Sequence, residues 1–249
     1  MVYTYIWVNL MEIIDAKWEY RNLGMTVQEI SFDENDTVDN SFESIRYLKA
    51  QYQVAKVKAD NTEVLYMLQK NGFVYIEDQI HVLHNLQKVE RNRLHQRMQD
   101  SVTYHKMDNN ELDELYMEIN EGMFDTDRIA LDDKFGKSIS AKRYNNWIKD
   151  MVEEGITPYA LIYKDSVCAF VVLKEVDKGI FDSVLGGYYK AYRNTGLGIV
   201  EKEMDIVSAM GGKKIYSSVS SNNPTQLRAM CINGYIPVGI NHVLVKHVQ

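Results

Sequence analysis

One segment of this chain occurs twice, and the repeat limits the folds that the chain can adopt. The two copies, 162 positions apart, are residues 57–73 (VKADNTEVLYMLQKNGF) and residues 219–235 (VSSNNPTQLRAMCINGY). In each copy a strand-like stretch leads to an asparagine, a short helix and a glycine, and a second strand-like stretch follows. The asparagines, Asn61 and Asn223, can accept hydrogen bonds from the free amides that open a helix. The repeat therefore predicts two related strand–helix–strand units, although two unrelated units of this common type would look similar.

A polar and highly charged stretch, from His84 to Ser101, separates the two copies. Such a stretch predicts a connector between two halves of the chain. The length of 249 residues is compatible with one or two domains. We therefore predict a smaller N-terminal domain at residues 1–95 and a larger C-terminal domain at residues 96–249.

The second half shows a regular alternation of helical and strand-like patterns. Two amphipathic helices are followed by three strands joined by short turns, and then by a helix, a strand, a helix and a strand. The expected elements are helices at 108–123 and 141–152, strands at 159–163, 167–176 and 180–189, a helix at 199–210, a strand at 213–220, the helix of the second repeat copy, and a strand at 235–248. This order predicts a mixed α/β (α+β) layer fold with a mostly antiparallel sheet and flanking helices.

Composition and charge argue against several classes of function. The formal net charge of −7 disfavours nucleic-acid binding, because affinity for phosphates depends on clustered Lys and Arg. The six histidines show no metal-ligand spacing, so we expect no metal site. The longest apolar run, Val167 to Leu173, is far shorter than the roughly 20 residues of a membrane span, and we expect no membrane segment.

The compartment is expected to be the cytoplasm. Residues 1–11 contain no basic side chain, and acidic residues follow closely, which makes a poor signal peptide. Cys168 and Cys231 are the only cysteines, and each lies in an apolar stretch. We therefore expect two reduced thiols in the core of the protein.

A segment that leaves a strand and opens a helix is the most informative motif. Residues 188–198 read YYKAYRNTGLG. Successive amides at such a turn point outward, and the helix dipole adds positive charge, so the pattern predicts an anion site. Gly196 and Gly198 would let the backbone approach a phosphate without a Cβ clash. A simple turn and helix cap is the alternative. A dinucleotide fingerprint is excluded, because Glu201 stands where it needs a third glycine, and the Gly-Lys-Ser/Thr of a P-loop is absent.

This segment resembles the acetyl-coenzyme A loop of the Gcn5-related N-acetyltransferase (GNAT) superfamily. The surrounding order matches as well: a strand, Arg193-x-x-Gly196-x-Gly198, a helix, a strand, and Asn223 opening a helix that ends with Gly234-Tyr235. The resemblance covers residues 102–249 and implies the GNAT acyl-CoA N-acyltransferase fold, with acetyl-coenzyme A (acetyl-CoA) as co-substrate. The residues that it implies for acetyl-CoA binding are Tyr188, Tyr189, Arg193, Asn194, Thr195, Gly196, Leu197, Gly198, Ile199 and Asn223.

The first half looks like a degenerate GNAT-like domain. Residues 59–61 with Gly72-Phe73 are similar to the first domain of the superfamily members that acetylate dTDP-fucosamine (dTDP-4-amino-4,6-dideoxygalactose). Phe124, and Tyr144 with Trp147, are similar to residues of the sugar-side helices of those enzymes. The resemblance implies an amino-sugar nucleotide as acceptor. At helical spacing, Tyr144 and Trp147 could equally belong to the core.

Two further residues are assigned from their chemistry. Arg128 could hold a substrate phosphate, because a guanidinium suits that geometry, and a solvated loop arginine is the alternative. Asp182, on the strand before the loop, is the best-placed carboxylate to remove a proton from an ammonium group, and an exposed hairpin aspartate is the alternative.

One departure from the superfamily pattern concerns catalysis. Many members carry a proton-donating Tyr seven residues after the Asn position, where this chain has Met230, and a thioether donates no proton. We expect an acetyl-CoA-dependent N-acetyltransferase that acts on a small-molecule amine by direct attack in a ternary complex. Acetylation of peptide or protein N-termini, and a catalytically weak acyl-CoA sensor or scaffold, are the alternatives. A homodimer is left open.

Overall fold

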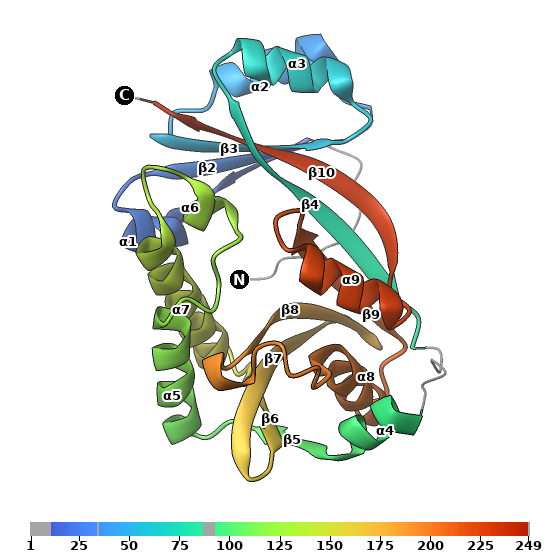
Figure 1. The fold of residues 1–249 in the computed structure, drawn as a ribbon. Coiled ribbons are helices and arrows are strands. Elements are labelled where there is room, and N and C mark those ends of the chain that lie inside the picture. The colour runs from blue at the N-terminus through green and yellow to red at the C-terminus, as the bar shows by residue number, and fades with distance from the viewer. Residues whose placement is uncertain (1–10, 34, 87–92, 249) are drawn as a thin grey trace.

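The computed structural model describes residues 11–33, 35–86 and 93–248 (Figure 1). The strands are β1 (Glu12–Asp15), β2 (Val27–Phe32), β3 (Tyr52–Lys58), β4 (Val74–His84), β5 (Val102–Lys106), β6 (Tyr159–Tyr163), β7 (Ser166–Asp177), β8 (Ile180–Tyr188), β9 (Lys214–Ser220) and β10 (Ile236–His247). The helices are α1 (Tyr20–Leu23), α2 (Val38–Arg46), α3 (Thr62–Lys70), α4 (Arg93–Asp100), α5 (Asn109–Asn120), α6 (Arg128–Leu131), α7 (Lys137–Glu153), α8 (Ile199–Ala209) and α9 (Pro224–Ile232), with short 3-10 helices η1 (Lys17–Glu19) and η2 (Lys190–Tyr192).

A single large sheet runs through both halves of the chain. Its strand order is β1-β2-β3-β10-β4-β9-β8-β7-β6-β5. Within the described ranges, the parallel pairs are β2 with β3 and β8 with β9, and the other neighbours are antiparallel. Helices α2 and α3 lie against the N-terminal part of the sheet, and α5, α7 and α8 lie against the C-terminal part (Figure 1). The predicted mixed, mostly antiparallel sheet with flanking helices is confirmed.

Both copies of the sequence repeat form the predicted strand–helix–strand unit. The residue ranges of β3 and α3, shifted by the repeat offset, are those of β9 and α9, and the last strands β4 and β10 begin at equivalent positions. These last strands are exchanged: β10 pairs with β3, and β4 pairs with β9. Asn241 lies opposite Lys58, and the equivalent residues Gln79 and Ser220 also lie opposite each other. The repeat therefore generates a local two-fold arrangement, centred where Gln79 meets Asn241.

The connector is partly helical. The polar stretch that separates the repeat copies includes α4, and residues 87–92 lie outside the described ranges. Because the sheet continues across both halves, the boundary between residues 95 and 96 stays a prediction. Strand β5 was not expected from the sequence, since it is an edge strand in which only Val102 is buried and no apolar alternation marks it.

The core of the C-terminal half lies on both faces of β7. Residues 168–173 of this strand are all buried. Val171 belongs to the apolar cluster that contains Met204 and Val207 of α8, and Phe170 to the cluster that contains Leu115 of α5 and Ile148 of α7. A strand covered on both faces has an unbroken apolar sequence, which explains the run found in this segment.

The prediction for the cysteines was half right. Cys168 is buried in β7, but Cys231 is exposed, so its assignment to the core is wrong. The reason is helical geometry: Met230 is the residue of α9 that is buried, and Cys231 points about 100° away from it.

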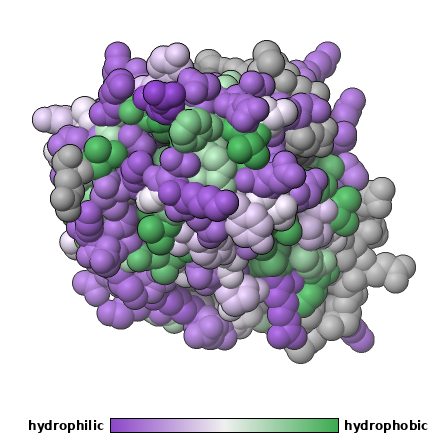
Figure 2. All heavy atoms as spheres, turned by 90° about the horizontal axis from the view of Figure 1, so that it is seen from above, coloured by the Kyte–Doolittle hydropathy of each residue, from purple (hydrophilic) through white to green (hydrophobic). Residues whose placement is uncertain are grey.

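The face seen from above is mostly polar, with apolar side chains exposed in small groups (Figure 2). Across the described ranges, no helix combines the length and the apolar character that crossing a bilayer requires.

One gap in the sheet positions the candidate site. Strands β8 and β9 are paired only where Ile180–Asp182 lie beside residues 214–216. Beyond Asp182 the pairing stops, while both strands continue. Backbone pairing between the facing edges of the two strands therefore ends at this point, although the Ser183 carbonyl still accepts a hydrogen bond from the Ser217 hydroxyl at 2.9 Å.

Candidate functional site

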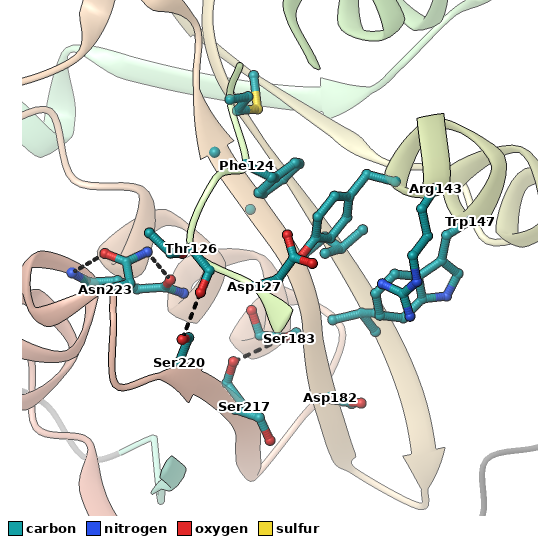
Figure 3. Close-up of a pocket in the computed structure, with 18 of the residues that line it drawn as sticks. Phe124, Thr126, Asp127, Arg143, Trp147, Asp182, Ser183, Ser217, Ser220 and Asn223 are labelled. Carbon is teal, nitrogen blue, oxygen red and sulfur yellow. Dashed lines mark hydrogen bonds between the residues drawn. The ribbon is translucent and has the colours of Figure 1, made fainter. Parts of the chain in front are cut away.

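A cavity of about 940 Å³ opens where β8 and β9 separate. Its walls come from β8, β9, α8 and α9 of the C-terminal half, from α7 and the segment before α6, and from β2, β3 and β4. In Figure 3, Asn223 lies on one side of the cavity, Arg143 and Trp147 lie on the opposite side, and Ser183 and Ser217 lie between. A cavity of this size is at the upper end of ordinary small-molecule sites.

The free edge of β8 supplies backbone donors to this cavity. Tyr189 donates its amide to the Cys168 carbonyl at 3.0 Å, so the amide of Tyr189 points toward β7. Because hydrogen-bonded pairs alternate along an antiparallel ladder, Tyr188 and Gly186 direct their amides away from β7, toward the gap. Of the two tyrosines expected at the co-substrate, Tyr188 thus presents its backbone to the cavity, whereas the amide of Tyr189 is used within the sheet.

The loop that follows β8 has the conformation of an anion cradle. Asn194 and Gly196 have positive φ angles of 65° and 74°, and Gly198 is the N-cap of α8. Among the residues that the structure describes, the amides of Gly196, Leu197 and Gly198 have no hydrogen-bond partner. These amides are therefore available to an anion at the positive end of the helix dipole.

The side chains of the loop hold its shape. Tyr188 accepts a hydrogen bond from the Ile199 amide at 3.3 Å and donates its hydroxyl to the Leu197 carbonyl. Thr195 donates its hydroxyl to the Tyr192 carbonyl at 2.7 Å, and Arg193 Nη2 reaches the Gly122 carbonyl at 3.1 Å. Leu197 is buried in the core. These contacts fix the loop and leave the amides of Gly196, Leu197 and Gly198 free.

Two side chains lie against the cradle. A Cβ atom added at Gly198 would collide with Gln99 Nε2 and with the Glu201 carboxylate, so this close approach requires glycine. Glu201 is the acidic residue in the first turn of α8, where a negative charge interacts favourably with the dipole. A diphosphate would use the same positive potential, and Glu201 would have to turn away to admit it.

The opposite wall of the cavity is aromatic. The rings of Phe124 and Tyr144 are stacked, with centroids 4.2 Å apart, and Tyr144 and Trp147 are stacked at 6.2 Å. Arg143 lies over the Trp147 ring at 5.7 Å. Tyr144 is buried and also belongs to a core cluster, so the functional and the core interpretations of this residue apply together.

Arg128 lies in an ionic network that joins the two halves of the chain. Its guanidinium is 2.5 Å from Glu29 and 3.6 Å from Glu19, and Arg143 Nε donates to Glu19 at 2.6 Å. Lys56 completes the network at 2.8 Å from Glu29. Glu19 is fully buried. Arg128 thus lines the cavity, but its charge is compensated by carboxylates of the same chain.

Asp182 stands at the point where the two strands separate. Its side chain lines the cavity, and across the described ranges it has no hydrogen-bond or ion-pair partner. Burial raises the pKa of Asp182 to about 6, although Lys174, its neighbour on β7, opposes this shift. A carboxylate with this pKa is largely ionised at neutral pH and still a useful proton acceptor.

A second buried carboxylate, Glu203 of α8, was not expected from the sequence. It accepts hydrogen bonds from the Ser183 hydroxyl at 2.8 Å and from the Tyr235 hydroxyl. Burial raises the pKa of Glu203 to about 7, and the hydrogen bonds from Tyr235 and Ser183 oppose the shift. Its position four residues before the buried Val207 would have placed it on the inner face of the helix, which is the signal that the sequence contained.

The structure brings most of the predicted residues into one cavity. Those that line it are Tyr188, Arg193, Ile199, Asn223, Asp182, Phe124, Arg128, Tyr144 and Trp147, together with the buried Met230. Tyr189, Asn194, Thr195, Gly196, Leu197 and Gly198 are not part of its lining. Asn223 caps α9 by accepting a hydrogen bond from the Gln226 amide at 3.1 Å.

Comparisons with known proteins inform the fold. No protein-family model matches the chain, and no curated protein matches it by sequence. Solved structures do match. A GCN5-related N-acetyltransferase from Sphaerobacter thermophilus is 10% identical over 96% of this chain and 76% of that chain, with a TM-score of 0.63. A GCN5-related N-acetyltransferase from Kribbella flavida is 14% identical over 90% of this chain and 82% of that chain, with a TM-score of 0.54.

A third matching structure is described as a tandem protein. A tandem GNAT protein from the clavulanic acid biosynthesis pathway is 8% identical over 89% of this chain and 77% of that chain, with a TM-score of 0.50. At these identities the likeness concerns the fold alone. The fold of this chain is that of the GNAT N-acetyltransferases.

Proposed function

We propose that this protein is an acetyl-CoA-dependent N-acetyltransferase that acts on a small-molecule amine. The observation that carries the proposal is the separation of β8 from β9, which opens the cavity and exposes the amides of Gly186 and Tyr188. The fold shared with GNAT acetyltransferases makes this gap the natural place for the co-substrate. The acyl thioester supplies the activated acetyl group.

The residues of the loop fit the diphosphate of such a co-substrate. The unpartnered amides of Gly196, Leu197 and Gly198 supply donors at the N-terminus of α8. Asn223, on the other side of the gap, lines the part of the cavity beside the free edge of β8. The Gly186 amide, which is the free main-chain donor of β8 closer to Asp182, supports the oxyanion where the acetyl group is transferred.

Asp182 acts as the general base. An amine attacks a thioester only when it is neutral, and at neutral pH most alkyl amines are protonated. The raised pKa of Asp182, about 6, lets this carboxylate take the ammonium proton, directly or through water. Holding the amine and the thioester in one cavity then supplies most of the remaining rate enhancement.

The acceptor that the sequence resemblance favours is an amino sugar linked to a nucleotide, of the dTDP-fucosamine class. Support for a sugar comes from the aromatic wall of Phe124, Tyr144 and Trp147, because sugar rings stack on such faces. The nucleotide part has less support, since Arg128, the residue expected to hold a phosphate, is already paired with Glu29.

The first half of the chain, residues 1–95, is proposed to be a degenerate GNAT-like domain. The repeat unit β3-α3-β4 has the same residue offsets as β9-α9-β10, and a tandem GNAT protein is among the matching structures. Strands β2 and β3 stay paired from Val27 to Phe32, in contrast to β8 and β9. Without a gap between its parallel strands, the described part of this half forms no second co-substrate site of the same kind.

A catalytically weak acyl-CoA sensor is the second candidate. Met230 favours it, because this buried thioether lines the cavity where many superfamily members have a proton-donating Tyr. Under this alternative the cavity binds acyl-CoA, and no amine is acetylated.

Two measurements test the proposal. Calorimetric titration with acetyl-CoA should show binding, and release of free thiol should be observed with at least one member of a panel of primary amines. Binding without thiol release on any amine would favour the sensor. An absence of binding would remove both candidates, and Gly196→Val, which obstructs the loop, serves as the control for binding at the cradle.

A further inference from the structure

The cavity is electrically asymmetric along β8. At the Tyr188 end, β8 leads into the loop with free amides at the N-terminus of α8. At the Asp182 end, six residues earlier, the cavity is bordered by the last turns of α7. Six residues of strand span about 20 Å, so the two ends are well separated. An anionic co-substrate suits the first end, and the charges at the second end then bear on the acceptor.

Carboxylates outnumber cations in the cavity wall. The acidic residues that line it are Glu19, Glu29, Glu77, Asp125, Asp127, Asp150, Glu153, Glu154, Asp182 and Glu203, and the basic ones are Arg21, Lys56, Arg128, Arg143, Lys174 and Arg193. All of these cations except Arg193 already have a carboxylate within ion-pair distance. Arg193 donates to a backbone carbonyl. Among the described residues of the wall, carboxylates are therefore in excess, and each cation already has a hydrogen-bond or ion-pair partner within the chain.

The excess of negative charge gathers at the Asp182 end. Asp182 is half-buried and, among the described residues, has no hydrogen-bond or ion-pair partner. Its neighbour across the strands, Lys174, is 3.8 Å from Glu154, at the C-terminus of α7. Glu153 lies in the same last turn, where the helix dipole is itself negative. An unpaired carboxylate in the cavity wall beside such a turn destabilises the folded protein unless a cation from outside the chain compensates its charge.

The aromatic wall of the cavity also favours a positively charged ligand. Trp147 precedes the acidic turn of α7 by about two helical turns, and it lines the cavity together with Tyr144. The faces of Trp and Tyr attract cations, and Arg143 already uses this property at 5.7 Å from Trp147. Carboxylates combined with aromatic faces form a surface that favours organic ammonium groups over phosphates.

We propose that the acceptor carries a second positive charge, as an alkyl diamine or a similar dication does, and that this charge binds at the acidic last turn of α7, beside Glu153, while Asp182 faces the reacting amine. The inference rests on the proposed N-acetyltransferase activity and narrows its substrate class. The reacting ammonium gives one proton to Asp182, directly or through water, and the neutral amine forms the amide bond as the thioester C–S bond breaks. The second proton lost by the amine goes to the leaving sulfur, so coenzyme A departs as the free thiol, while the second ammonium of the acceptor stays charged. A nucleotide-linked amino sugar would instead bring two phosphate charges into a negative cavity.

The test compares acceptors that differ in charge. Thiol release from acetyl-CoA is measured with butylamine, a series of linear diamines beginning with 1,4-diaminobutane, glucosamine and UDP-glucosamine, each at low and at high salt. The proposal predicts a kcat/KM at least tenfold higher for a diamine than for butylamine, with the advantage decreasing as salt screens the charges. Binding of the same diamines to the coenzyme A complex, measured by calorimetry, is a second readout that needs no turnover.

A pair of variants tests the placement of the second charge. Glu153→Gln should lower the ratio of kcat/KM for the diamine to that for butylamine at least threefold, with butylamine unchanged. Glu63→Gln, in the exposed first turn of α3 and outside the cavity, should leave both values unchanged. An unaltered ratio in Glu153→Gln would overturn the placement.

The outcomes separate this inference from the proposed function. Equal rates for diamines and butylamine, faster turnover of UDP-glucosamine, or preference for a basic peptide over every diamine would overturn the inference while the acetyltransferase activity stands. Thiol release with none of the amines would instead overturn the proposed function. In that case failure of the diamines to bind in the calorimeter would reject the charge argument independently.

Discussion

Asp182→Asn should stabilise the folded protein at neutral pH and lower its activity. Burial raises the pKa of Asp182 from its ordinary value of 3.8 to about 6. A raised carboxylate pKa means that the folded state disfavours the charged form. At a pH below the ordinary value the group is protonated in both states and costs nothing. As the pH rises toward 6, the ionised carboxylate destabilises the folded state more and more, and above pH 6 this destabilisation reaches its full value.

The size of the effect follows from the same shift. Roughly two pH units correspond to about 3 kcal/mol, and solvent access at the cavity wall makes about 1 to 3 kcal/mol the expected gain. Asparagine has a similar shape and no charge, so the variant does not suffer the destabilisation that the ionised carboxylate causes. For a chain of this length each kcal/mol raises the melting temperature by about 2 to 4 °C.

Urea unfolding at pH 4 and at pH 8 measures this prediction. The variant should match the wild type at pH 4 and be more stable at pH 8, and its rate of thiol release should lose the ionisation near pH 6. Asp113→Asn on the exposed face of α5 is the control and should show no comparable pH-dependent gain. An equal change at both pH values, or lower stability at pH 8, would refute the assignment of an uncompensated buried carboxylate.

Three further predictions concern the loop and the ionic network. Gly196→Val should abolish measurable coenzyme A binding in calorimetry while the far-UV spectrum stays native, because a β-branched residue is strained at a φ of +74°; unchanged affinity would reject the loop assignment. Glu201→Gln should tighten coenzyme A binding about fivefold, or about 1 kcal/mol, by removing a like charge near the diphosphate, and weaker binding would contradict this. Arg143→Ala should lower the free energy of unfolding by about 3 to 5 kcal/mol, because it removes the partner 2.6 Å from the buried Glu19. Urea unfolding measures this loss, and a loss below about 1 kcal/mol would show that the protein does not need the ion pair for its stability.

The elements of the second half could be predicted because their signals are local. Strand β6 begins and ends at the predicted residues, and α8 and β9 differ from the predicted bounds by a single residue at an end. Helix α5 begins after Asp108, whose side chain forms a capping box with Glu111. A cap and an apolar period lie within a few residues of each other, so no knowledge of the tertiary fold is needed to recognise them.

The candidate site was predicted in part. The loop residues were predicted from glycines at a strand-to-helix turn and from the resemblance to an acetyl-CoA loop, and Asp182 was predicted from its place on the strand before that loop; their roles stay predictions. The network of Glu19, Arg128 and Arg143 was not foreseen. Glu19 is more than 100 residues away from both arginines in the sequence, and no local pattern marks their contact.

The amino-acid sequence by itself determined the order of strands and helices, the repeat of one strand–helix–strand unit, and a glycine loop suited to an anion. Each of these depends on backbone preferences and on periodicity over short stretches. The tertiary structure decided that β4 and β10 change places, that β8 and β9 separate after Asp182, and that Cys231 faces outward. It also set the charge of the cavity, because pairing and burial depend on side chains that only the folded chain brings together.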